Sequence, residues 1–88
     1  MYKNKNGTRN NIAGINIKII RKNMPQKMSQ KQLADQMQLA GIDINKNAIQ
    51  RIESGERFIT DIELLTFSKV LNVPLEQLLN TTIKKDTL

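Results

Sequence analysis

The sequence predicts one all-α domain, a compact bundle of five short helices. Apolar residues recur at helical spacing in several separate segments, and Ser, Thr, Asn and Gly stand where these segments begin and end. No segment alternates polar and apolar residues in the way that a half-buried strand does. A chain of 88 residues is long enough for one small core, so we expect a single folded unit.

The first helix is expected over about residues 12–23. Asn10 or Asn11 can cap its start, and Pro25 ends it because a residue before proline is disfavoured in the helical conformation. Its inward stripe comprises Ala13, Ile17, Ile20 and Met24. Ile15 and Ile19 fall off this stripe, and we expect them in the core or against the fifth helix.

The second helix is expected from Ser29 to about Ala40. Ser29 and Gln32 form an S-x-x-Q capping box, and Gly41 supplies the left-handed stop. The residues expected to be buried are Leu33, Ala34 and Met37. The turn that follows, residues 42–44, should bury at least one of its two isoleucines.

Asn45 caps the expected third helix and Gly55 ends it, with Ala48, Ile49 and Ile52 facing inward. A second box, T-x-x-E at residues 60–63, opens a fourth helix that runs through Asn72. Its apolar face comprises Leu64, Phe67, Val70 and Leu71. A short fifth helix is expected from Leu75 to about Asn80, with Pro74 at its start and with Leu75, Leu78 and Leu79 closing the core.

The predicted domain thus covers residues 12–80, between an N-terminal arm (1–11) and a short tail (81–88). The arm is polar, basic and rich in Asn, so we expect it to be flexible. Two interpretations of the arm stay open: a tether that enters a DNA groove, and a terminus that only keeps the chain soluble.

The composition excludes several classes of site. The chain has no Cys and no His, which removes the usual zinc ligands and the commonest general base. We therefore expect no metal, no cofactor and no enzymatic activity. The N-terminus has no signal-peptide pattern and no segment has transmembrane length, so a cytoplasmic protein without membrane contact is expected.

The charge of the chain is asymmetric. The net charge is +6, and no acidic residue occurs before Asp35 although eight basic residues do. Lys and Arg that neutralise phosphates release condensed counterions, so this asymmetry favours a polyanionic partner. For the charge asymmetry alone, a solvated surface is the preferred explanation.

The polar positions of the expected third helix are the strongest functional signal. Lys46, Asn47, Gln50 and Arg51 lie opposite its apolar positions. Asn and Gln can pair with adenine, and Arg and Lys with guanine, when a helix lies in the major groove. An ordinary solvated helix face would have the same pattern, so this pattern alone favours neither DNA reading nor a solvated face.

Three segments shift that balance: S-Q-K-Q-L-A at 29–34, A-I-Q-R-I-E-S-G-E-R at 48–57 and L-N-V-P-L-E-Q-L-L at 71–79. With them, residues 13–79 resemble the Cro/cI-type (XRE-like) helix-turn-helix DNA-binding family. The resemblance implies a lambda-repressor-like domain. The stretch from Leu33 to Ile49 is longer than the family's usual spacing. We therefore expect a lengthened second helix and an extended connection between helices two and three.

The resemblance also implies roles for individual residues. The base-reading positions are Lys46, Asn47, Gln50 and Arg51. The phosphate-binding positions are Ser29, Gln30, Lys18, Arg21, Lys22 and Arg57. Glu53 matches a glutamate with a structural role.

The expected function is sequence-specific binding of double-stranded DNA by a transcriptional repressor that acts as a homodimer. An antitoxin or a restriction-modification controller of the same fold fits the sequence as well. A protein-interaction module that does not read DNA would instead show an apolar patch that includes Ile15, Ile19, Ile83 and Leu88. RNA binding is disfavoured because the chain offers few aromatic residues for stacking.

Overall fold

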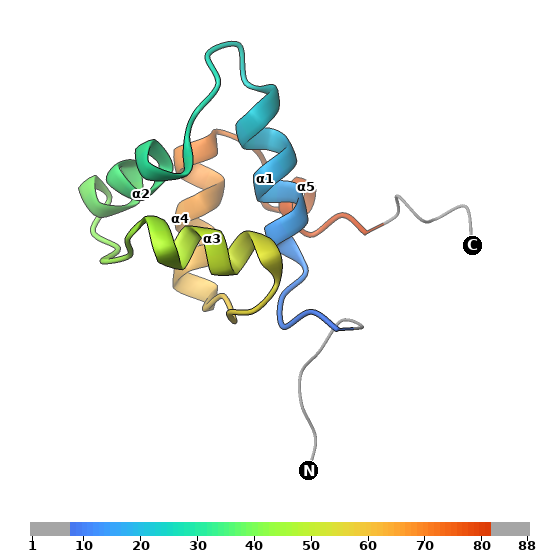
Figure 1. Ribbon diagram of the computed structural model, residues 1–88. Coiled ribbons are helices and arrows are strands. Elements are labelled where there is room, and N and C mark those ends of the chain that lie inside the picture. Colours follow the sequence, from blue (N-terminus) through green and yellow to red (C-terminus); the bar gives the residue numbers. More distant parts are fainter. Residues whose placement is uncertain (1–7, 82–88) are drawn as a thin grey trace.

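The computed structural model describes residues 8–81 of the chain. This part forms five α-helices, which confirms the predicted all-α bundle (Figure 1). They are α1 (Ala13–Asn23), α2 (Gln30–Leu39), α3 (Lys46–Ser54), α4 (Asp61–Leu71) and α5 (Leu75–Leu78). No helix within residues 8–81 is long and apolar enough to span a bilayer.

Both predicted capping boxes are present. At the start of α2, Ser29 Oγ accepts a hydrogen bond from the Gln32 amide at 3.0 Å, and Gln32 Oε1 accepts one from the Ser29 amide at 2.8 Å. At the start of α4, Thr60 and Glu63 exchange the equivalent bonds at 3.1 and 3.0 Å. Each box satisfies amide donors that the first turn of a helix leaves free.

The ends of α3 also follow the sequence. The side chain of Asn45 accepts a hydrogen bond from the Ala48 amide at 2.9 Å, and Gly55 ends the helix with a φ of 89°. Glycine populates this left-handed region at little cost because it has no Cβ. The nine-residue helix between them has sharply defined ends.

The core lies between α1, α2, α3 and α4, and α5 closes one side of it. α3 packs against α1 and α2, whereas α4 packs against α1, α2 and α5. The largest fully buried side chains are Phe67, Ile17, Leu33, Met37, Ile49, Ile52 and Leu78. Each had been predicted to face inward, because helical spacing identifies the buried face of a helix well.

The connection from α2 to α3 is extended, as expected, but α2 itself is not lengthened. α2 ends at Leu39, and residues 40–45 form an ordered loop. Gln38 Nε2 donates to the Ile44 carbonyl at 2.7 Å, and the Ile42 amide donates to the Met37 carbonyl at 2.9 Å. Ile44 is buried in the core, so the loop is fixed at both ends.

The expected packing of Ile15, Ile19, Leu75 and Leu79 is wrong. The two isoleucines are 43% and 47% exposed, and the two leucines are 38% and 39% exposed. The physical reason is the length of α5, which ends at Leu78 after a single turn and buries only that leucine. A helix this short cannot cover the outer face of α1.

Candidate nucleic-acid interface

The four predicted base-reading residues lie together on the outer face of α3. Lys46, Asn47, Gln50 and Arg51 are all exposed, while Ile49 and Ile52 of the same helix are fully buried. Within the described residues, these four side chains make no hydrogen bond and no ion pair. The outer face of α3 therefore offers free amide and cationic donors to a ligand.

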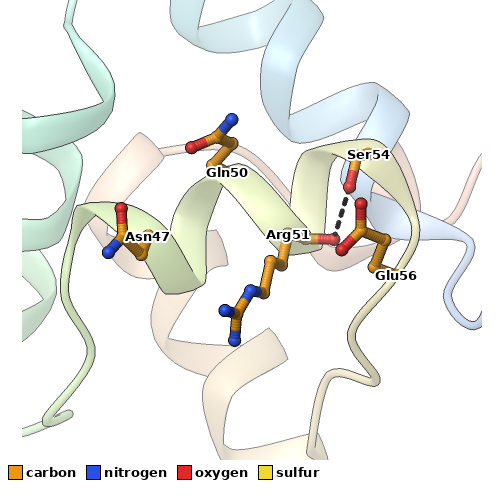
Figure 2. Close-up of a pocket in the computed structure, with 5 residues that line it drawn as sticks. All are labelled: Asn47, Gln50, Arg51, Ser54 and Glu56. Atoms are coloured by element: carbon orange, nitrogen blue, oxygen red, sulfur yellow. Dashed lines mark hydrogen bonds between the residues drawn. The ribbon is translucent and has the colours of Figure 1, made fainter.

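This face is hollowed beside the C-terminal half of the helix. A shallow pocket of about 230 Å³ is lined by Asn47, Gln50, Arg51, Ser54 and Glu56 (Figure 2). The Ser54 hydroxyl donates to the Arg51 carbonyl at 3.1 Å, which keeps its side chain against the helix. Ser54 and Glu56 also line the pocket, although neither was among the predicted base-reading residues.

Arg21 does not lie on the phosphate-binding surface where the sequence placed it. It is 6% exposed, and its Nε and Nη2 atoms donate to the two carboxylate oxygens of Glu53 at 2.8 Å. Its Nη1 donates to the Met28 carbonyl at 2.9 Å. The guanidinium is thus turned inward and joins α1 to α3, so it is not available to a phosphate.

Gln30 and Ser29 stand at the start of α2, next to this ion pair. Gln30 Nε2 donates to Glu53 Oε1 at 3.0 Å, so Glu53 joins α1, α2 and α3 through one carboxylate. The sequence predicted a structural role for Glu53 in holding the start of the loop after α3, whereas its carboxylate instead holds α1 and α2 against α3. Gln30 is half-buried, and Ser29 is exposed with its hydroxyl engaged in the capping box.

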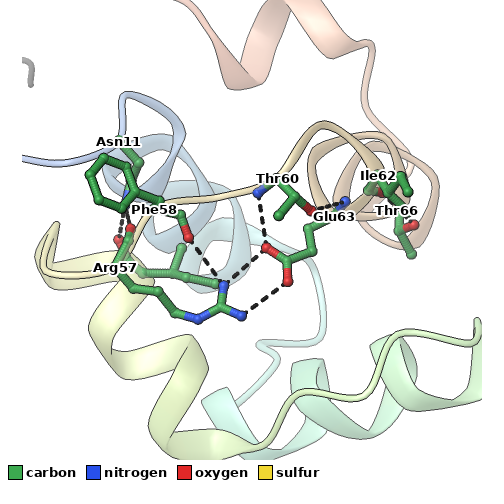
Figure 3. A network of polar contacts seen from close by, with 8 residues as sticks. Asn11, Arg57, Phe58, Thr60, Ile62, Glu63 and Thr66 are labelled. Carbon is green, nitrogen blue, oxygen red and sulfur yellow. Dashed lines mark hydrogen bonds and ion pairs between the residues drawn. The ribbon is translucent and has the colours of Figure 1, made fainter. Parts of the chain in front are cut away.

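Arg57 lies in the loop between α3 and α4 and is also paired. Its Nη1 and Nη2 atoms donate to the two Glu63 oxygens at 3.0 Å, and Nη1 also donates to the Phe58 carbonyl at 3.2 Å (Figure 3). The Arg57 hydrogen bond lowers the pKa of the Glu63 carboxyl below its ordinary value. About a third of the Arg57 side chain stays exposed, so its charge reaches the surface.

Lys18 and Lys22 are exposed on α1. Lys18 is one helical turn from both Gly14 and Arg21, the α1 residues that face α3, because residues three and four apart lie on one side of a helix. A Cβ on Gly14 would collide with the Ile52 carbonyl of α3, which shows how closely the two helices approach. Lys18 is therefore at the edge beside α3, and Lys22 is one turn further along.

Residues 9–11 are not part of a free arm. The Asn10 amide donates to the Gly55 carbonyl at 2.8 Å, and Arg9 Nη2 donates to the Glu53 carbonyl at 2.9 Å. Asn11 Oδ1 accepts from the Gly14 amide at 2.7 Å, so Asn11 also caps α1, as was predicted for Asn10 or Asn11. The rest of the predicted arm, residues 1–7, lies outside the described residues, as do Ile83 and Leu88 of the tail.

The surface holds no obvious metal site. Among residues 8–81, no three Asp or Glu side chains cluster closely enough to bind a metal ion. The features of the site are instead amide, hydroxyl and cationic side chains on and around one helix.

Comparison with known proteins agrees with this geometry. The model of a helix-turn-helix family, of the Cro/cI (XRE) type, matches residues 17–78, which is well over half of the chain. A search of curated proteins and a search of solved structures each found no match. The matched range includes α2, α3 and the loop between them, together with all four outer residues of α3. The chain therefore belongs to the Cro/cI-type helix-turn-helix family of DNA-binding domains.

Proposed function

We propose that this protein binds a specific double-stranded DNA sequence through the outer face of α3 and represses transcription as a homodimer. One observation carries the proposal: the side chains of Lys46, Asn47, Gln50 and Arg51 are exposed and have no hydrogen-bond or ion-pair partner among residues 8–81, while the opposite face of α3 is buried. A helix fixed in this way can enter a major groove, where amide and guanidinium groups distinguish base edges.

The phosphate contacts are proposed on either side of α3. Ser29 and Gln30 stand at the start of α2, where the helix dipole favours an anion. The capping box already uses the Ser29 and Gln32 amides, so the amide of Gln30 is offered to a phosphate. Lys18 and Lys22 supply exposed cations on α1, and Arg57 supplies a partly exposed one on the loop after α3. Arg21 is left out of this set, because its guanidinium is buried against Glu53.

The small size of the surface supports a homodimer. A single small module buries limited area on DNA, and specific affinity usually requires two half-sites about one helical turn apart. A dimer bound over a promoter would exclude the polymerase from the same DNA, and this is how we expect repression to arise.

The proposal is tested by selecting bound sequences from a random duplex library and titrating the selected site at two salt concentrations. We expect a two-fold symmetric site whose affinity falls steeply with salt, because phosphate contacts release counterions. Asn47→Ala or Arg51→Ala should cost about 1–3 kcal/mol of discrimination between the selected and a scrambled site. Gln30→Ala or Lys22→Ala should weaken binding to both sites alike.

A matched control is Lys69→Ala, which removes one exposed positive charge from α4, far along the chain from the reading residues. It should leave the discrimination between the selected and the scrambled site unchanged. Selection that enriches no sequence would refute sequence-specific binding, and an asymmetric site bound by one copy would refute the homodimer.

One observation favours a second function, binding of another protein. Ile12, Ile15 and Ile19 are 40–47% exposed and follow one face of α1. Substituting Ile15 and Ile19 with Ser separates the two functions. A change that leaves DNA selection intact but alters the sedimentation or partner binding of the protein would assign this face to protein contacts.

A further inference from the structure

We propose that Arg9 is a positioning residue for DNA reading, acting with Asn10 and Asn11 to hold the C-terminal end of α3 and the loop that follows it. We call residues 9–11 the α3 anchor. The proposal rests on the function proposed above, and its own evidence is a set of hydrogen bonds that join the start of the described chain to residues more than forty positions away.

Arg9 bonds directly to the last turn of α3. Its Nη2 donates to the Glu53 carbonyl at 2.9 Å and to the Ile52 carbonyl at 3.3 Å. The final carbonyls of a helix have no partner inside the helix, and they carry the negative end of its dipole. A guanidinium at this place satisfies both needs with one group.

Gly55 makes room for Arg9. A Cβ at Gly55 would lie 2.8 Å from Arg9 Cζ, closer than side chains pack, and the residue also has the positive φ that favours glycine. The glycine that ends α3 thus serves a second purpose, since it lets the Arg9 side chain lie against the turn.

Asn10 holds the loop after α3. Its amide donates to the Gly55 carbonyl at 2.8 Å, and its Nδ2 donates to the Glu56 carbonyl at 2.9 Å. Glu56 lines the pocket on the reading face, so this bond fixes the backbone of a residue that borders the base-reading side chains.

Asn11 completes the anchor from the start of α1. Its Nδ2 donates to the Ile52 carbonyl at 3.0 Å and to the Arg57 carbonyl at 2.7 Å. Its Oδ1 accepts from the Gly14 amide, so one side chain joins α1, the end of α3 and the residue proposed to bind phosphate.

The anchor lies outside the part of the chain that the family model matches, which begins at residue 17. Its bonds to α3 are therefore not implied by the family match. None of the three residues belongs to the proposed reading set, so the anchor acts through the placement of α3 and its loop.

The test compares full-length protein with Arg9→Ala, Arg9→Lys and, as charge-matched control, Lys69→Ala. Amide hydrogen exchange is measured without DNA, and affinity for the selected site is measured over a series of salt concentrations. Asn10→Ala serves as a milder variant, because it removes the Glu56 bond and keeps the backbone bond to Gly55.

We expect Arg9→Ala to speed exchange of the Gly55, Glu56 and Arg57 amides, while amides in α2 and α4 stay protected. Affinity for the selected site should fall about tenfold, and Arg9→Lys should recover part of it because a cation remains at the helix end. The slope of log K against log salt should be unchanged, since the loss of one phosphate contact would reduce it by about 0.9.

If Arg9→Ala leaves amide exchange at residues 55–57 unchanged, Arg9 does not hold the end of α3 and the proposal is wrong. A reduced salt slope would overturn the positioning role in favour of a direct phosphate contact by Arg9, and an affinity loss equal to that of Lys69→Ala would reduce it to a bulk charge effect. If the unaltered protein selects no DNA sequence, the proposed function fails, and the exchange measurement still decides whether residues 9–11 hold α3.

Discussion

Two arginine–glutamate pairs lie near the C-terminal end of α3, one formed by Glu53 in its last turn and one by Arg57 in the loop that follows, and they differ in surroundings more than in geometry. Arg21 and Glu53 meet through two bonds of 2.8 Å, and Arg57 and Glu63 meet through two bonds of 3.0 Å. The side chains of the first pair are 8% and 3% exposed, whereas those of the second are 32% and 11% exposed.

The difference shows that burial, and not bond length, decides what each pair does. An ion removed from water must be compensated fully, so either partner of the buried pair is indispensable to the other. A pair near the surface can exchange its partner for water, and its loss costs less. The inner pair therefore fixes where α3 lies, and the outer pair closes the loop that leaves it.

The largest effect is expected for Glu53→Ala. Arg21 would keep its charge in the core without a carboxylate, and Gln30 would lose its partner, so the free energy of unfolding should fall by about 3–5 kcal/mol. Urea unfolding measures this directly. The double substitution Arg21→Met with Glu53→Leu should recover most of the loss, because an apolar pair leaves no buried charge. A loss for Glu53→Ala below about 1 kcal/mol would contradict the claim that the buried pair is the more important of the two for stability.

A smaller effect is expected for Glu63→Ala. This change removes the Arg57 bonds and half of the capping box of α4, and both sites retain access to water. The free energy of unfolding should fall by about 1–2 kcal/mol. Glu63→Gln is the matched control, since an amide oxygen can still accept from the Thr60 amide. If Glu53→Ala and Glu63→Ala lowered the free energy of unfolding equally, burial would not determine which pair contributes more to stability.

The outer pair should also make stability depend on pH. Because folding lowers the pKa of Glu63, its contribution is fully present above the ordinary glutamate pKa of 4.5 and is lost as the pH falls through the lower folded value. The stability difference between the unaltered protein and Glu63→Gln should therefore shrink between pH 7 and pH 3. A difference that grows on acidification would have the wrong sign for this mechanism.

The smallest effect is expected for the exposed pair Lys31–Asp35, one turn apart on α2. Its side chains are 72% and 52% exposed, and the atoms are 3.2 Å apart. Asp35→Ala should change the free energy of unfolding by less than about 0.5 kcal/mol. Thermal melting at low and high salt tests this. A loss of stability as large as that of Glu63→Ala would contradict the expectation that the most exposed pair contributes least.

The sequence predicted those parts of the fold that depend on neighbours along the chain. The capping boxes at Ser29 and Thr60 and the stop at Gly55 each involve residues within one turn, so their pattern is visible in the sequence. The buried stripes followed from helical spacing, and the exposure of Lys46, Asn47, Gln50 and Arg51 followed from the positions left over on α3.

The long-range polar contacts could not be predicted in the same way. Arg21 and Glu53 are 32 positions apart, so their pairing cannot be seen from neighbours in the sequence. Arg21 continues the helical spacing of the buried Ala13 and Ile17, but its charge led to the expectation of an exposed position like that of Lys22. Arg9 and Asn11 looked like parts of a polar arm, because their partners are backbone carbonyls that leave no trace in the sequence. Ile15 and Ile19 were misplaced because a pattern of spacing does not give the length of α5.

The free side chains on the outer face of α3 have a consequence for how the domain can change. Among the described residues, the bonds that hold α3 use the Glu53 carboxylate and the carbonyls at the helix end, and they use none of the side chains of Lys46, Asn47, Gln50 and Arg51. Those four positions can be varied together while the framework keeps its contacts. The domain is thus a scaffold on which new sequence preferences can evolve, or be engineered, by exchanging a few residues without redesigning the fold.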